Sequence, residues 1–246
     1  MCPVSDGSRA EHHEARGRAI RHSPRGGPIN SDVVLQMKLD PAWLATAQSA
    51  VETSVDSLVD QFMRDPFAHR VEHSFHLDAY NLLVDHDVLS GRYHEIGRSG
   101  YRTQSVHKEW PSTEIFSLKD GTPRRQSYDL GILAPESIHA ATLDDFTSGR
   151  ISAAIAVELG LDYADSHLLG DIHKLTRNPV ALGYIVHFSR KRTRRSTQVE
   201  QAILRRPDKI KTAFVHLDVK TGDGTYKRIF DSQIRPWRYT PDAPSS

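Results

Sequence analysis

Two carboxylates stand inside apolar segments of this chain, and they are the residues best placed to do chemistry. Glu158 lies within residues 154–161 (AIAVELGL), which carry no other charge. A charge in a buried strand costs several kcal/mol unless it is paired or bound to a metal. Asp129 lies in a strand-like segment, 126–133 (QSYDLGIL), between a serine and a glycine. Small neighbours leave both carboxylates open, and clustered carboxylates are what a hard cation such as Mg²⁺ binds.

A third carboxylate, Glu72, belongs to a helical pattern. It precedes Phe75, Ala79 and Leu82 or Leu83 at spacings that put it toward the core side of its helix. If the strands that carry Asp129 and Glu158 pair, all three carboxylates can line one site. The sequence therefore predicts a Mg²⁺ (or Mn²⁺) site with Glu72, Asp129 and Glu158 as ligands.

The elements that must position these residues follow from hydrophobic periodicity. Asp40 followed by Pro41 predicts the start of an amphipathic helix over about 41–63. Helices are also predicted at about 70–85, from Asp165 or Ser166 to 177, and at 197–206. Strands are predicted at 101–110, 113–118, 126–133, 151–161 and 182–188, with a hairpin of strands at 212–219 and 225–231.

The domain organisation follows from composition. Residues 1–35 are read as a disordered, mildly basic arm, residues 36–235 as one α/β domain, and residues 236–246 as a tail. Within the domain, a core at about 70–188 is followed by an extension at 189–235 that contains a helix and the hairpin.

The order of these elements and acids resembles the PD-(D/E)XK, or restriction-endonuclease-like, superfamily. The resemblance covers about residues 70–188 and implies an α-β-β-β-α-β core, with a mixed central sheet flanked by helices. In that family, acids from the first helix and from the second and third strands hold Mg²⁺. Glu72 in RVEHSFHLDAYNLL, Asp129 in QSYDLGIL and Glu158 in IAVELGL match those positions.

The chain departs from the family pattern at one position. The family's lysine, two residues after the strand acid, is Gly160 here. Some members supply a cation from the next helix, and Lys174 in DIHKL is the candidate that the resemblance implies. Lys174 lies about 200° around the helix from Ile172, which places it toward solvent if the buried face is Leu168, Leu169, Ile172 and Leu175.

Histidine offers weaker evidence for a metal site. His69 and His73 have the i, i+4 spacing of helical zinc sites, but no glutamate follows the first histidine as that motif requires. His76 and the other histidines show no known ligand spacing. The sequence alone therefore predicts a site built from carboxylates.

The charge distribution favours a polyanionic partner. Net charge is +1, yet residues 190–211 hold nine Lys and Arg against two acids. Arg190, Lys191, Arg192, Arg194 and Arg195 are the predicted nucleic-acid contacts. A solvated basic surface is the alternative for the same run.

Composition excludes several classes of protein. The chain has 246 residues, a single cysteine, 38% hydrophobic residues and no apolar run long enough to span a bilayer. A disulfide scaffold and a cysteine-rich zinc site are excluded. The first residues have no apolar core of a secretion signal, so a cytoplasmic protein without membrane contacts is expected.

The function expected from the sequence is Mg²⁺-dependent hydrolysis of phosphodiesters, with DNA favoured over RNA. Glu72, Asp129 and Glu158 would hold the metal, and Lys174 would assist the attacking water. A homodimer or a larger assembly remains open. One alternative is an inactive nuclease-fold protein that binds nucleic acid or belongs to a nucleoprotein assembly. Another is an unrelated α/β protein whose buried acids pair with basic residues of the core.

Overall fold

The computed structural model describes residues 39–90, 93–117, 120–163, 165–190, 209–219, 223–229 and 235–239. All of them belong to the unit Met37–Ser246. The expected arm at residues 1–35 and the expected helix at 197–206 lie outside these described ranges.

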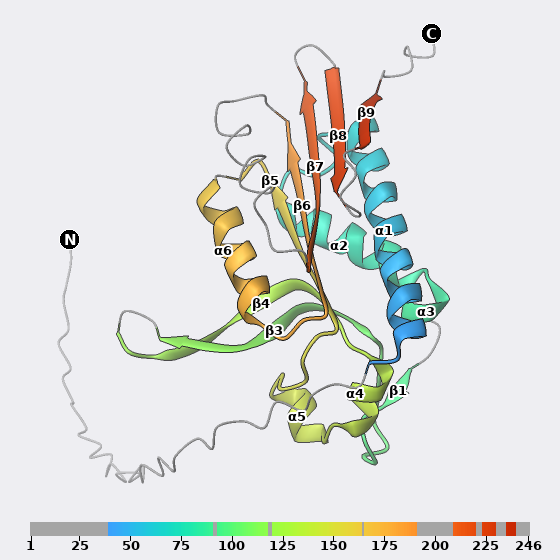
Figure 1. Ribbon diagram of the computed structural model, residues 1–246, viewed down its shortest axis with the longest axis vertical. Coiled ribbons are helices and arrows are strands. Elements are labelled where there is room, and N and C mark those ends of the chain that lie inside the picture. The colour runs from blue at the N-terminus through green and yellow to red at the C-terminus, as the bar shows by residue number, and fades with distance from the viewer. Residues whose placement is uncertain are drawn as a thin grey trace, which may run out of the picture. The chain divides into compact units, whose positions relative to one another are not determined.

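The described chain begins with three helices, and strands predominate after them (Figure 1). The helices are α1 (Pro41–Arg64), α2 (Glu72–Val84), α3 (Asp87–Ser90), α4 (Pro135–Ala140), α5 (Leu143–Thr147) and α6 (Asp165–Arg177). The strands are β1 (His94–Glu95), β2 (Arg102–Thr103), β3 (Val106–Ser117), β4 (Pro123–Ile132), β5 (Ile155–Leu161), β6 (Leu182–Ser189), β7 (Ile210–Asp218), β8 (Asp223–Ile229) and β9 (Arg235–Tyr239).

A mixed sheet organises these elements. Its described strands follow the order β3-β4-β5-β6-β7-β8-β9, so each strand pairs with its neighbour in sequence. The pairs β3–β4 and β4–β5 are antiparallel, whereas β5–β6 and β6–β7 are parallel. The last two pairs, β7–β8 and β8–β9, are again antiparallel. The predicted mixed α/β class with a mixed sheet flanked by helices is confirmed.

Helices cover both faces of the sheet. On one face, α1 and α2 bury Phe62 and Phe75 against alternate residues of β5, β6 and β7. On the other face, α6 packs Leu168 and Leu175 against the sheet. Figure 1 shows α6 and the α1–α2 pair on opposite sides of the strands. Strand β5 is therefore buried on both faces, as its unbroken apolar sequence predicts.

Helix α1 starts where its cap signal predicts. The Asp40 carboxylate accepts a hydrogen bond of 2.9 Å from the Ala42 amide, and Pro41 occupies the first helical turn. The predicted hairpin after the core is also confirmed, because β7 and β8 pair in register from Thr212–Ile229 to Asp218–Asp223.

Two expectations on secondary structure were wrong. The strands expected at 101–110 and 113–118 are instead the short strand β2 and one long strand, β3, whose register shifts between Pro111 and Ile115. The proline and the bulge break the alternation, so the pattern looks like two elements. The segment from Pro236 was expected to be a tail, but β9 adds it to the sheet edge. Residues 134–150, for which the sequence predicts no element, contain the short helices α4 and α5.

Candidate metal centre

Helix α2 brings two potential ligands to the sheet. Glu72 is its first residue and His76 lies one turn later, on the same side. Phe75 and Ala79 are buried in the core and fix the rotation of the helix. The prediction that Glu72 points toward the core side is consistent with its side chain, which is only 22% exposed.

Asp129 enters the site where two strands separate. The β4–β5 ladder ends at the pair Leu130–Val157, so the next pair would be Asp129 opposite Glu158. The Asp129 carboxylate instead accepts a hydrogen bond of 2.7 Å from the backbone amide of Leu159. The Asp129 side chain thus replaces the backbone acceptor that a continued ladder would supply.

Glu72, His76 and Asp129 converge on one point. Their potential ligand atoms all lie within 4.8 Å of one another. The His76 Nε2 atom is 3.8 Å from Glu72 Oε1 and 3.6 Å from Asp129 Oδ2. These distances are too long for hydrogen bonds, but they suit three ligands of one cation.

His76 is the side chain whose environment most needs a bound cation. It is 4% exposed, and neither ring nitrogen has a hydrogen-bond partner among the described residues. An unsatisfied buried nitrogen costs about 1–3 kcal/mol. A divalent cation between the two carboxylates would satisfy Nε2, so the residues present fit a metal ion.

The electrostatics of Asp129 support the same conclusion. Burial raises the pKa of its carboxyl, while His76, the Leu159 amide and Lys174 act to lower it. A carboxylate held in such a place gains from a cation that replaces its lost hydration.

Glu158 is near this group but has a different partner. It is 2% exposed in the middle of β5, and the Lys174 ammonium lies 2.8 Å from its Oε1 atom. Burial raises the pKa of Glu158 and Lys174 opposes that rise. Glu158 was expected to be a metal ligand. The geometry does not favour that role, because the Lys174 ammonium already balances the charge of the Glu158 carboxylate.

Helical geometry favoured a solvent-facing Lys174 over its candidate role beside the acids, and the solvent-facing placement was wrong. The residue is 8% exposed. Its ammonium also donates a hydrogen bond of 2.9 Å to the Ser127 carbonyl and lies 3.4 Å from Asp171 Oδ1. The mistake came from the choice of buried face on α6, because Leu169 is 52% exposed. The buried side includes Asn178, one turn beyond Lys174.

The position of Gly160, where the family has its lysine, leaves no room for a side chain. A Cβ atom added there would lie 2.7 Å from His187 Nδ1 and 3.3 Å from the Tyr163 ring. The His187 ring is stacked on Phe214 at 5.6 Å, and burial lowers its pKa to about 4. Among the described residues, Lys174 of α6 is the only lysine that lies beside Glu158.

The predicted nucleic-acid contacts are only partly described. The Arg190 guanidinium binds the Asp162 carboxylate, with Nε at 2.8 Å, and donates to the His69 carbonyl at 3.0 Å. These bonds hold the Arg190 guanidinium against other parts of the fold. Lys191, Arg192, Arg194 and Arg195 lie outside the described residues. His69 pairs with Asp78 at 3.2 Å rather than with His73.

Sequence reasoning missed His76 and Asp171. The signal for His76 was its spacing of four residues from Glu72, which places both on one side of a helix. Asp171 lies three residues before Lys174, and burial raises the pKa of its carboxyl to about 6. Both residues were visible only as ordinary polar positions of amphipathic helices.

Comparison with known proteins returned no relatives: no protein family, no curated protein and no solved structure matches this chain. Within the part of the chain that the structure describes, none of the helices has both the length and the apolar character needed to cross a bilayer.

Proposed function

We propose that this protein is a divalent-metal-dependent nuclease that hydrolyses phosphodiesters in DNA. The observation that carries the proposal is the convergence of Glu72, His76 and Asp129 beside the buried Lys174–Glu158 pair. The element order α2-β3-β4-β5-α6-β6 agrees with the restriction-endonuclease-like core that the sequence resembles. The strand directions, two antiparallel pairs followed by a parallel one, agree with a mixed core sheet.

Glu72, His76 and Asp129 would hold the metal. A bound divalent cation supplies a Lewis acid for a phosphoryl oxygen and lowers the pKa of a bound water. The imidazole ligand favours Mn²⁺ over Mg²⁺, because nitrogen ligands suit borderline transition metals whereas Mg²⁺ prefers oxygen.

Lys174 would supply the second positive charge of the site. Its ammonium is held by the Ser127 carbonyl and by Glu158, so it keeps a fixed position next to Asp129. A fixed cation in a poorly solvated place stabilises negative charge that develops on a phosphate. The proposed role of Glu158 is to orient Lys174 and keep it protonated.

The first test is metal binding, which does not depend on knowing the substrate. The free energy of unfolding should rise by about 2.7 kcal/mol when the free cation is at 100 times its dissociation constant. For a chain of this size, that corresponds to a rise in Tm of about 5–10 °C. His76→Ala should abolish the Mn²⁺-induced rise, whereas His173→Ala, which changes an exposed histidine of α6, should keep it.

The second test is cleavage of circular and linear DNA and of single-stranded RNA with Mn²⁺ or Mg²⁺. Wild type should cut DNA, and Asp129→Asn and Lys174→Met should each cut at least about 100-fold more slowly. His173→Ala should cut like wild type.

A binding protein without nuclease activity is the second candidate. Its supporting observation is that Lys174 is already surrounded by Glu158, Asp171 and the Ser127 carbonyl. Metal binding and DNA binding without cleavage in any protein of the series would favour this candidate. No response to either cation would refute the metal site itself.

A further inference from the structure

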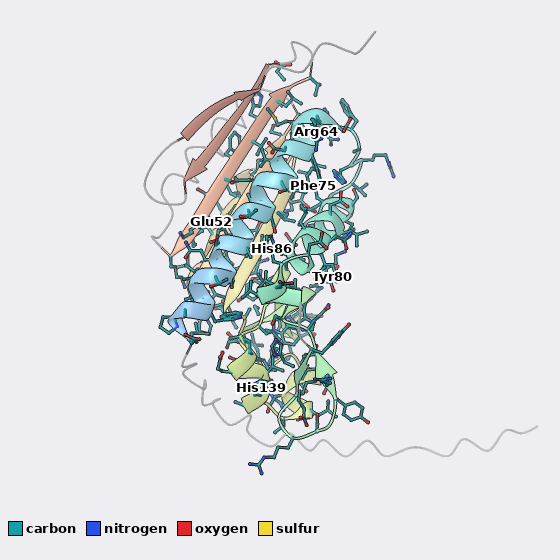
Figure 2. All side chains as sticks on the ribbon, turned by 90° about the vertical axis from the view of Figure 1, so that its right-hand side faces the viewer. Glu52, Arg64, Phe75, Tyr80, His86 and His139 are labelled. Atoms are coloured by element: carbon teal, nitrogen blue, oxygen red, sulfur yellow. The ribbon has the colours of Figure 1, made fainter. Side chains whose placement is uncertain are left out.

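A second polar and aromatic surface lies away from the metal centre. It comprises the β1–β2 hairpin, residues 93–102, together with the cavity beside it. Figure 2 shows His139, which lines this cavity, far down the molecule from Phe75, the neighbour of His76. The surface is therefore separate from the proposed metal ligands.

The hairpin is fixed to the body of the protein. Ile96 is 3% exposed and belongs to the same core cluster as Ile138 of α4. The Gly97 amide donates to the Ile138 carbonyl at 3.1 Å. Gly97 has a positive φ of 56°, and a Cβ there would lie 2.2 Å from the Ala141 carbonyl oxygen. Only glycine permits this close contact, so the hairpin is held in one position.

The fixed hairpin presents rings and guanidinium groups to solvent. Tyr93 is 61% and Tyr101 is 64% exposed, and Arg98 and Arg102 are also exposed. The single acid of the hairpin, Glu95, accepts a hydrogen bond of 3.0 Å from the Gly100 amide.

The adjoining cavity has a volume of about 1080 Å³ and is lined in part by Trp43, Tyr93, His94, Arg102 and His139. This is slightly above the usual range for small-molecule sites, ~300–1,000 Å³. The rings of His94 and His139 meet edge to face at 5.6 Å. The Trp43 indole N–H is buried without an acceptor among the described residues. The lining thus combines aromatic stacking surfaces with the Arg102 guanidinium and one acid, Asp87.

We infer that the β1–β2 hairpin and its cavity bind single-stranded nucleic acid, with unpaired bases stacking on Tyr93 and Arg102 contacting phosphate. Base stacking on aromatic rings beside basic groups is the common basis of single-strand binding. The inference shares with the proposed nuclease only the expectation of a nucleic-acid ligand.

The test is binding of a fluorescein-labelled 12-mer of oligothymidylate, followed by anisotropy in EDTA. Tyr93→Ala should weaken binding between about 5- and 150-fold, the range for loss of one base stack. Tyr93→Phe keeps the ring and should bind within about 2-fold of wild type. Arg102→Ala should lower the slope of log K against log salt by about 0.7. Arg64→Ala, an exposed arginine at the far end of α1, should leave the slope unchanged.

Three results would overturn the inference. Equal binding by wild type and Tyr93→Ala would exclude stacking at this position. Thymidine monophosphate competing as well as the 12-mer would identify a mononucleotide pocket instead. Photo-crosslinks from a 5-iodouracil oligonucleotide that map only to other segments would place the strand elsewhere.

The test is independent of catalysis. EDTA removes the proposed cation from the binding assay, and the hairpin is remote from the metal ligands. If cleavage is absent while Tyr93→Ala still weakens binding, the nuclease proposal fails and this inference stands. If cleavage occurs but Tyr93→Ala binds the 12-mer normally, this inference fails and the nuclease proposal stands.

Discussion

Removing the Lys174 ammonium should expose the cost of the carboxyl that it neutralises. In Lys174→Met, Glu158 keeps its buried position in β5 but loses the partner at 2.8 Å. Loss of one partner of a buried ion pair usually costs about 3–5 kcal/mol. The side chain of methionine keeps most of the apolar stem, so the change is mainly electrostatic.

The structure limits this cost. Glu158 can avoid a buried charge by taking up a proton. At pH 7, which lies about 2.5 units above the ordinary carboxyl pKa of 4.5, protonation costs about 3.4 kcal/mol. We therefore expect the free energy of unfolding to fall by about 3 kcal/mol at pH 7. Because the folded variant binds a proton that the unfolded chain releases above pH 4.5, the deficit should grow with pH between about 4.5 and 7.

The assay is urea unfolding of metal-free protein at pH 5, 6 and 7. A double variant, Lys174→Met with Glu158→Gln, removes the charge as well and should recover much of the loss at pH 7. A deficit below about 1 kcal/mol at pH 7, or one that is the same at pH 5 and pH 7, would refute the reasoning.

Three further predictions concern the surroundings of the site. Gly160→Ala should destabilise the fold by about 1–3 kcal/mol because its Cβ meets the His187 ring. A Cβ added at Gly170 in α6 meets no atom within 4 Å, so Gly170→Ala should raise stability by up to about 1 kcal/mol. Denaturant unfolding of the two variants tests this contrast, and equal effects would contradict it. Burial lowers the pKa of His187 to about 4 in the folded protein, so the unfolded chain takes up this proton at a higher pH. Stability should therefore fall by up to about 3.4 kcal/mol as pH drops from 6.5 to 4, a dependence that His187→Gln should flatten. Asn178→Ala removes the acceptor of two hydrogen bonds from β3 and should cost about 1–3 kcal/mol by thermal unfolding, with an unchanged Tm as the opposing result.

Much of the fold was predictable because the relevant signals are local. The cap at Asp40, the unbroken apolar run of β5 and the turn between β7 and β8 each depend on a few adjacent residues. Strand β9 was not predictable in this way, because its place at the sheet edge depends on β8 rather than on its own alternation.

The candidate site was predictable only in part. Asp129 and Glu158 stood out because a carboxylate in an apolar strand demands a partner, yet the sequence does not show which partner each one has. Lys174 satisfies Glu158 through a long side chain whose direction depends on how α6 packs. His76 resembles any polar residue of a helix until the fold places it against Asp129.

The hydrogen bond from the Leu159 amide to Asp129 has a consequence for how the protein opens. The same carboxylate closes the β4–β5 ladder and faces the proposed cation, so strand pairing and cation occupancy share one side chain. A cation that binds only the closed arrangement holds the two strands together by mass action. Exchange of the Leu159 amide proton with deuterium should then slow in proportion to cation concentration, while amides of the paired strands β7 and β8 exchange at unchanged rates. One backbone proton would thus report occupancy of the site without any knowledge of the substrate.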